Sequence, residues 1–335
     1  MQQTLEISWA TLWRIFIFVV FVAVLFLGRQ IILGLFLAIV ISSGLEGVVS
    51  HLERIGLPRS VSVILIFFAA VLVVTLLIYM AFPLAIVELN TILGTIGKTS
   101  GGLNFLTSFN GVRTVNGFIN RLSSQIFSGN ATPLDFFSNA LGGFGLALAV
   151  IISSFYLCLS RDGVERFLKV VIPPDYEAAA LRIYERSRKK MGAWFQMQLF
   201  SSAIMGFIIW GGLTLLNVRY AFLIGVLGAI FEIVPFIGPI LSGALAVASA
   251  LATSTALAIY TLIFFLIAQQ FESHFLVPVF NRYSVGLHPV IVITAVLIGA
   301  EVGGFLGIVI SIPLAAVFQE VVTDWSIQKR SAVSS

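Results

Sequence analysis

The stretch Gly228-Ala-Ile-Phe-Glu-Ile-Val-Pro-Phe-Ile-Gly-Pro239 decides how this chain folds. It contains Glu232, the only charged residue between Arg219 and Glu272. The residues around that carboxylate are almost all apolar, which is typical of a membrane interior. A carboxylate at the centre of a membrane helix costs about 2.5–3.5 kcal/mol on insertion scales. Such a residue predicts a site with a function.

The same stretch also predicts a break in the helix. Pro235, Gly238 and Pro239 follow the glutamate closely. Proline lacks a backbone donor and clashes with the preceding turn, so we expect the helix to break within 234–239. Irregular backbone at membrane depth occurs where protein buries it or where it lines a cavity. A charge beside a break therefore indicates a binding or transport site. The alternative is a kinked helix whose Glu232 pairs with a neighbour and only holds the bundle together.

The composition is that of a polytopic membrane protein. The chain has 335 residues, of which 59% are hydrophobic and 10% charged, with a mean hydropathy of +1.06. A soluble domain carries about 25% charged residues. The net charge of +4 comes from basic residues that cluster in loops, which fits membrane orientation better than nucleic-acid binding. The first eight residues are polar and run into a full-length apolar stretch, so we expect no cleavable signal peptide.

Runs of apolar residues divide the chain. Each of the four in the first half is long enough to cross a bilayer core of about 30 Å. They cover 9–27, 31–49, 61–82 and 136–159. The predicted organisation is three transmembrane helices in 1–83, an external amphipathic arm in 84–135, a fourth transmembrane helix in 136–160, a basic segment in 161–196, a transport core in 197–322 and a tail in 323–335.

Charge sets the predicted orientation. The segment 161–196 holds eight basic residues, so the positive-inside rule makes it cytoplasmic. Counting spans outward from it places both termini in the cytoplasm and 84–135 outside. In that arm apolar residues recur at helical spacing, which predicts helices lying on the membrane or against partner subunits. The alternative is a loosely ordered loop.

The last third reads as two similar units of opposite orientation. A span at 197–216 precedes an apolar stretch of 33 residues at 220–252, which is too long for one span and too short for two. We expect a re-entrant hairpin there. A span at 255–271, a polar loop and a second predicted hairpin at 289–322 follow. Inverted repeats with broken helices point to a secondary transporter. The predicted fold is thus an all-α polytopic membrane protein with about six full transmembrane helices and two re-entrant hairpins.

Polar residues in apolar surroundings are the candidate site residues. Glu232 and Glu301 lie near the predicted hairpin tips and could carry protons or bind a cation. His288 titrates near neutral pH when unperturbed, although it could instead cap a helix, and Glu301 could be an exposed loop acid. The full predicted set is Glu232, Pro235, Gly238, Pro239, Gln270, Glu272, Ser284, Gly286, His288 and Glu301.

Signatures of enzymes and of resident cofactors are missing from the sequence. It has no phosphate-binding Gly-x-x-x-x-Gly-Lys-Ser/Thr loop and no catalytic set within the apolar stretches. Its three histidines share no metal-ligand spacing, and Cys158 is the single cysteine. We therefore expect neither an enzyme nor a protein with a metal or cofactor.

The second half of the chain contains five distinctive motifs: Glu232-Ile-Val-Pro-Phe-Ile-Gly-Pro239, Gln269-Gln-Phe-Glu272, Val277-Pro-Val-Phe-Asn281, Ser284-Val-Gly-Leu-His-Pro289 and Ile312-Pro-Leu-Ala-Ala316. They resemble the motifs of one family of bacterial permeases, the autoinducer-2 exporter (AI-2E) family. In the N-terminal half, Leu52-Glu-Arg-Ile-Gly-Leu-Pro-Arg-Ser60 and Ser160-Arg-Asp-Gly163 add to this resemblance. The resemblance covers nearly the whole chain and is most specific over 186–320.

The resemblance implies a secondary transporter of the bacterial inner membrane that assembles as a homo-oligomer, a pentamer in this family. Some members are implied to export the signal molecule autoinducer-2, and others to exchange sodium or lithium for protons. Both a small-molecule and a monovalent-ion substrate stay open. A channel or a non-transporting scaffold is the alternative of another class. The nearest candidate pore-lining set, Gln196, Gln198, Ser201 and Ser202, is too short to line a span.

Overall fold

The computed structural model describes residues 9–73, 75–76, 143–235, 237–279 and 286–334. Every regular element within these ranges is a helix, so the prediction of an all-helical protein is confirmed for them. The amphipathic arm predicted at 84–135 and the candidate residue Ser284 lie outside the described residues.

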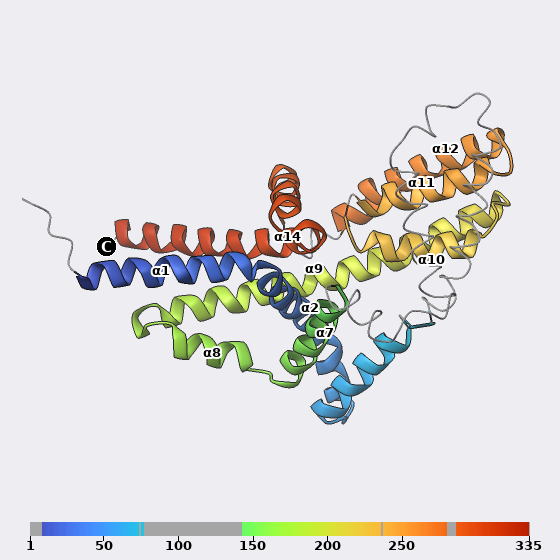
Figure 1. The fold of residues 1–335 in the computed structure, drawn as a ribbon. Helices are drawn as coiled ribbons and strands as arrows, with labels where there is room; N and C mark the ends of the chain where they lie inside the picture. Colours follow the sequence, from blue (N-terminus) through green and yellow to red (C-terminus); the bar gives the residue numbers. More distant parts are fainter. Residues whose placement is uncertain (1–8, 74, 77–142, 236, 280–285, 335) are drawn as a thin grey trace, which may run out of the picture.

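Figure 1 shows the described helices coloured in chain order. In chain order they are α1 (Trp9–Leu27), α2 (Arg29–Arg54), a helix at Arg59–Val73, α7 (Gly143–Leu159), α8 (Gly163–Val171), α9 (Pro174–Leu215), α10 (Ala221–Glu232), α11 (Ile237–Leu251), α12 (Thr255–Phe271), a π-helix (Glu272–Leu276) and α14 (Pro289–Ser334).

Four described helices are long and apolar enough to cross a membrane. They are Arg29–Arg54, Pro174–Leu215, Thr255–Val279 and Pro289–Arg330. A fifth span results if α7 and α8, which are bent by 91° at their junction, count as one. The chain is therefore an integral membrane protein, and the predicted count of six full spans is not confirmed among the described residues.

Helix α9 is the central helix, against which most of the other described helices pack. The sequence suggested a basic segment to 196 and a separate span from 197, but one helix of 42 residues runs through that boundary. Pro174 stands at its first turn, where proline is well accommodated. At 1.5 Å per residue the helix is about 63 Å long. Helices α2, α8, α10, α12 and α14 all pack against it.

Small residues let α9 and α10 approach closely. A Cβ atom added to Gly206 on α9 would lie 2.6 Å from the Cβ of Ala229 on α10. A Cβ added to Gly225 on α10 would lie 2.6 Å from the Cβ of Trp210 on α9. Helices within membranes associate through such close packing rather than through expulsion of water. These contacts fix the register between the two helices.

Three clusters of buried side chains lie between the described helices; the smallest consists of Val49, Val63 and Cys158, and the two larger ones involve α9. One joins α9 to the helices that follow it and consists of Ile209, Leu213, Val218, Ala221, Ile224, Ala246, Ala250 and Ala258. The other joins α9 to α2 and α14 and consists of Val40, Met191, Trp194, Leu287, Ile312 and Ala316.

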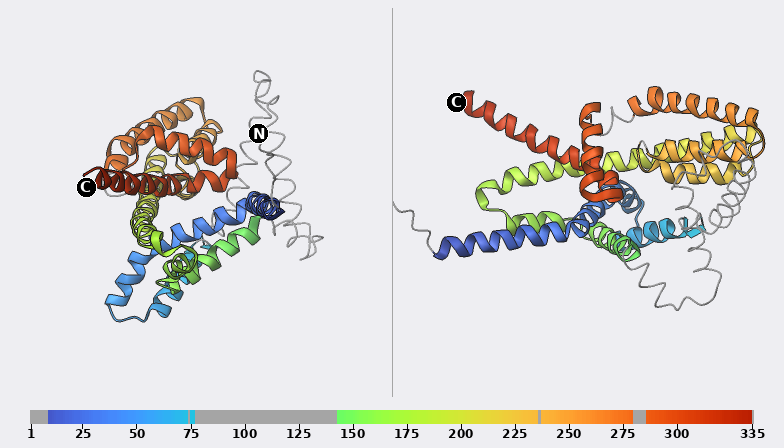
Figure 2. Two further views of the ribbon diagram at one scale, coloured as in Figure 1. Left: turned by 90° about the vertical axis from the view of Figure 1, so that its left-hand side faces the viewer. Right: turned by 45° about the horizontal axis from the view of Figure 1, so that its top comes forward.

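Helices α2 and α7 lie side by side in both views of Figure 2.

Helix α14 is broken into two arms. Gly304 has φ 57° and ψ −134°, a conformation that only glycine adopts easily. In a straight helix Gly299 and Gly307 would be about 12 Å apart. Here a Cβ on either glycine would overlap the carbonyl oxygen of the other, so the chain folds back between them. The interruption predicted at 299–304 is present, whereas the helix continues past the predicted end at 322 to Ser334.

Parts of two polar stretches between the predicted spans are helical. The residues 51–59 are rich in charge and were expected to form a short loop, but α2 continues to Arg54 and only the residues after it form the turn. The helix Thr255–Val279 continues past 271, where the predicted span ended, into residues expected to form a polar loop. Polar side chains in both stretches reach partners on the same or neighbouring helices, so polarity did not mark a loop there.

Candidate functional site

Helices α10 and α11 meet at a break where the sequence predicted one. Helix α10 ends at Glu232 and α11 begins at Ile237. The amide of Val234 donates to the carbonyl of Phe231 at 2.9 Å, which tightens the last turn of α10. Proline at 235 has no amide hydrogen to continue the helical bonding. The break therefore follows from the local sequence.

Gly238 allows the two helix ends to touch. A Cβ atom at this position would overlap the carbonyl oxygen of Phe231 and lie 2.7 Å from the Cα of Glu232. The carbonyl of Pro239, one residue on, accepts a hydrogen bond from the hydroxyl of Ser242 at 3.2 Å. Glycine is thus required because the start of α11 lies directly against the end of α10.

The side chain of Glu232 is buried at this tip. Only 2% of the residue is exposed. Its Oε2 atom has no hydrogen-bond partner within the described part of the chain. The carboxyl of Glu272 lies near enough to interact electrostatically with that of Glu232. A buried acidic oxygen without a partner is rare in proteins and marks a place where a ligand or proton can bind.

Glu272 reaches this position from the far end of α12. It is the first residue of the π-helix Glu272–Leu276, in which the amide of Val277 donates to the carbonyl of Glu272. Single π-turns within α-helices are frequent at functional sites. The side-chain Nε2 of Gln269 donates to Oε2 of Glu272 at 2.8 Å. The structure therefore brings together two of the predicted residues, Glu232 and Glu272, which are 40 positions apart.

Gln198 on α9 completes the surroundings of Glu232. Its Nε2 atom donates to the carbonyl oxygen of Glu232 at 2.6 Å. Sequence reasoning had considered Gln198 only as a pore-lining residue. A glutamine within an apolar helix was the available signal, because polar side chains inside membranes hydrogen-bond to neighbouring helices. One turn further along, the hydroxyl of buried Ser202 has no partner within the described residues.

Other predicted residues lie apart from the Glu232–Glu272 pair. Gln270 is exposed, and its carbonyl contacts Nδ1 of His274 at 3.0 Å. Gly286 is exposed with φ 62°. Nδ1 of exposed His288 accepts a hydrogen bond from the amide of Val290 at 3.4 Å, which is the geometry of a cap at the start of α14.

Glu301 lies on the first arm of α14, three residues before Gly304, and its side chain is exposed. Among the described residues it makes no ion pair.

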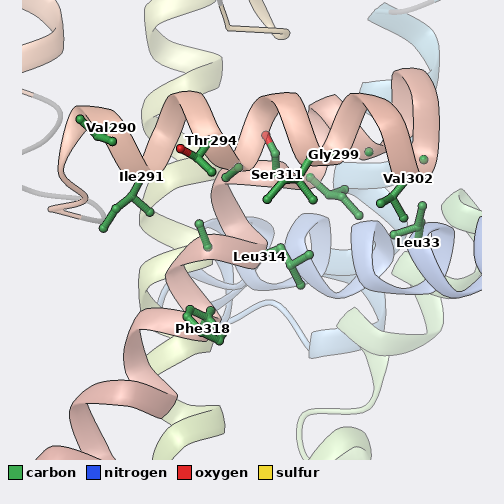
Figure 3. Close-up of a pocket in the computed structure, with 15 residues that line it drawn as sticks. Leu33, Val290, Ile291, Thr294, Gly299, Val302, Ser311, Leu314 and Phe318 are labelled. Carbon is green, nitrogen blue, oxygen red and sulfur yellow. The ribbon is translucent and has the colours of Figure 1, made fainter.

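An apolar cavity of about 440 Å³ lies in the angle of α14 (Figure 3). Its walls come from both arms of α14 and from Leu33 of α2, and Thr294 and Ser311 supply the hydroxyl groups. No residue of α10, α11 or α12 lines it. The cavity is therefore distinct from the site at the hairpin tip.

Ion pairs join the first half of α9 to the last part of α14. Glu320 and Asp324 are buried, at 5% and 4% exposure, and face α9. The ion-pair cluster consists of Lys190–Glu320 at 2.6 Å, Arg186–Asp324 at 3.7 Å, Arg182–Asp324 at 3.8 Å and Arg186–Glu320 at 3.9 Å.

A second group of ion pairs joins Glu46 of α2 to Arg59 at 2.9 Å and to Arg188 of α9 at 3.2 Å. Helix α9 thus holds both neighbours by charge.

Comparison with known proteins finds relatives along most of the chain. Residues 15–327 match the family model described as "AI-2E family transporter". YrrI of Bacillus subtilis is 22% identical over 94% of this chain and 89% of its own length. PerM of Escherichia coli K12 is 23% identical over 90% of this chain and 89% of its own length.

A third relative, YueF of Bacillus subtilis, is 28% identical over 51% of this chain and 47% of its own length. The names of YueF and YrrI record an inferred role in transport, and that of PerM an inferred permease. Since the family model spans nearly all of the sequence, the chain belongs to the AI-2E transporter family.

Proposed function

We propose that this protein is a secondary transporter that moves a small solute or a monovalent ion by alternating access, with Glu232 as its coupling carboxyl. Family membership and the apolar helices support a role in membrane transport. The single observation that carries the coupling role is the buried carboxyl of Glu232. It lies at the tip of a broken helix, faces Glu272, and leaves one oxygen without a partner in the described structure.

Close pairing makes the two acids sensitive to protons and cations. Two carboxylates near each other repel, and burial disfavours the charge on Glu232. A proton shared between Glu232 and Glu272, or a cation bound by both, removes that repulsion. A site that exchanges a proton for another ligand can couple the movement of the two.

The helix break provides a way to change access to this pair. Helices α10 and α11 flank the first break and pack against each other. Helix α14 has a second break at Gly304. Discontinuous helices at corresponding positions of two repeats are typical of secondary transporters, with the binding site at the repeat interface. We propose that the two broken elements are re-entrant hairpins and that one repeat moves against the other.

Two cargo classes fit this site. A monovalent cation such as Na⁺ or Li⁺ would bind the carboxylate oxygens directly, in exchange for protons. Export of a small polar signal molecule such as autoinducer-2 would instead be driven by proton movement down its gradient. The carboxyl pair agrees with either, because both require a proton site. We expect the protein to act in a bacterial inner membrane, as a homo-oligomer with both termini cytoplasmic. The exposed apolar surface of α1 suits contact with lipid or a second copy.

Proton flux in proteoliposomes tests the proposal. Vesicles with a preset pH gradient receive Na⁺, Li⁺ or K⁺, and a pH-sensitive dye inside reports the gradient. Collapse on adding Na⁺ or Li⁺, absent from protein-free vesicles, would establish cation/proton antiport. Efflux of autoinducer-2 that depends on the gradient would establish the exporter. A protein that conducts ions at channel rates without coupling to protons would contradict the proposal.

A further inference from the structure

The amide of Gln198 lies where it can control the geometry of the acidic pair. Its Nε2 atom donates to the main-chain oxygen of Glu232 at 2.6 Å, a bond between residues 34 positions apart. Glu232 is the last residue of α10, and the final carbonyls of a helix have no partner within that helix. The bond from α9 therefore holds the helix end that carries the buried carboxyl.

Helix α9 is a firm support for this bond. Two turns beyond Gln198, Gly206 is packed against Ala229 and the carbonyl of Gly225. Any shift of α9 along α10 would disrupt that contact, because neither helix has side-chain atoms there that could yield. The register between Gln198 and Glu232 is thus fixed from one side by backbone packing. At the end of α10, Gly238 of α11 lies so close that a Cβ atom added to it would overlap the backbone of Phe231 and Glu232.

We propose that Gln198 is the positioning residue of the Glu232–Glu272 pair: by holding the main chain of Glu232, it aims that carboxyl at Glu272. This role rests on the proposed transport function, since it concerns the geometry of the coupling site. A neutral donor suits it. The amide offers N–H to a carbonyl without adding a charge next to two acids, whereas a lysine would pair with the carboxyls themselves.

Gln196 provides a matched control on the same helix. Its Nε2 atom donates to the carbonyl of Gly44 on α2 at 2.7 Å, so it makes the same kind of interhelical bond to a different partner. If glutamines on α9 only stabilise helix packing, replacing either one should have similar effects. If Gln198 positions the pair, only its replacement should disturb the tip at 232–238.

Hydrogen exchange of the full-length protein in lipid nanodiscs tests the position directly. We expect Gln198→Leu to raise amide exchange in the peptide covering 231–238 by about fivefold to tenfold, the factor that corresponds to losing one ordinary hydrogen bond. Gln196→Leu should leave that peptide unchanged and alter the peptide around Gly44 instead. Equal effects of the two variants at 231–238, or no effect of Gln198→Leu there, would overturn the proposal.

A second variant tests whether the placement of Glu232 by Gln198 matters for transport. In Gln198→Glu the neutral carboxyl can donate to the oxygen of Glu232, whereas the ionised form cannot and repels both acids. We expect cation-driven or solute-driven proton flux of Gln198→Glu to approach that of wild type at acidic pH and to fall at alkaline pH more steeply than wild type. Flux of Gln198→Leu should be low at both. A pH profile of Gln198→Glu parallel to that of wild type would contradict the role.

The two assays separate the failure of this inference from the failure of the proposed function. Absence of coupled flux in the wild-type protein would contradict the transport proposal, while the exchange data would still show whether Gln198 holds the tip. Normal flux in wild type and Gln198→Leu alike would leave the transport proposal standing and reject the positioning role.

Discussion

Lys190 of α9 and Glu320 of α14 form a direct ion pair, with Nζ 2.6 Å from Oε1. The carboxylate side chain is only 6% exposed, and the lysine side chain 29%. Together with Arg186, which lies 3.9 Å from the same carboxylate, this pair fastens the second arm of α14 to α9. Lys190 and Gln198 lie on the same continuous helix, α9, so the ion pair and the candidate site share one support.

Removing the lysine should destabilise the protein substantially. Breaking a buried ion pair at one partner costs about 3–5 kcal/mol, because the remaining charge stays buried without its counter-ion. For Lys190→Met we expect a loss toward the lower end, because Arg186 still faces Glu320. Thermal unfolding in detergent measures the effect.

The exposed pair Lys189–Glu185, at 2.9 Å with side chains 76% and 63% exposed, is the matched control. Surface pairs of this kind contribute about 0–1 kcal/mol. Lys189→Met should therefore have almost no effect on unfolding. Similar melting temperatures for the two variants would show that the ion-pair cluster does not fasten α14.

Alanine at position 238 should disturb the hairpin tip. The added methyl group would overlap the carbonyl of Phe231 and approach the Cα of Glu232, and both are backbone atoms that cannot rotate away. Overpacking of this kind costs about 1–3 kcal/mol. We expect Gly238→Ala to lower the melting temperature and to impair transport.

Gly211 is the control for that substitution, because nothing lies within 4 Å of the position that a Cβ would occupy. In a helix interior alanine is favoured over glycine by about 1 kcal/mol. Gly211→Ala should accordingly be neutral or stabilising. If both alanine variants behave alike, the close approach at Gly238 is not present in the membrane.

The break in α14 should depend on glycine at 304. At φ 57° and ψ −134° any side chain is strained, by about 1–3 kcal/mol. Gly304→Ala should favour a straighter helix and separate Gly299 from Gly307. Spin labels at Thr294 and Leu314, which both line the cavity between the arms, would report that separation. An unchanged distance distribution in the alanine variant would show that Gly304 does not set the angle.

The sequence predicted those features that are encoded locally. The bounds of α1 and α12 agree with the predicted spans, because long apolar runs define a membrane helix. Pro235 and Gly238 located the break between α10 and α11 through the missing amide and the missing side chain. Glycines likewise indicated the interruption in α14 near Gly304.

Features that depend on contacts between distant residues could not be predicted from local patterns. The role of Gln198 depends on a carbonyl 34 positions away, and nothing near it in sequence indicates that partner. Glu272 was expected to follow the end of its span, but a π-helix extends the helix there, and its carboxyl lies within electrostatic reach of Glu232. Charge at 182–190 suggested a separate segment, whereas buried Glu320 and Asp324 supply counter-ions that keep α9 helical and packed.

Proton flux of Glu232→Gln in proteoliposomes tests the central claim most directly, with Glu185→Gln, an exposed acid outside the site, as the control. Glutamine preserves the size of the side chain but can neither release a proton nor bind a cation by charge. We predict that Glu185→Gln couples proton movement to cargo as wild type does, and that Glu232→Gln is folded but loses coupling by about two orders of magnitude. Coupled flux with an unchanged pH dependence in Glu232→Gln would show that the buried carboxyl is not the coupling site.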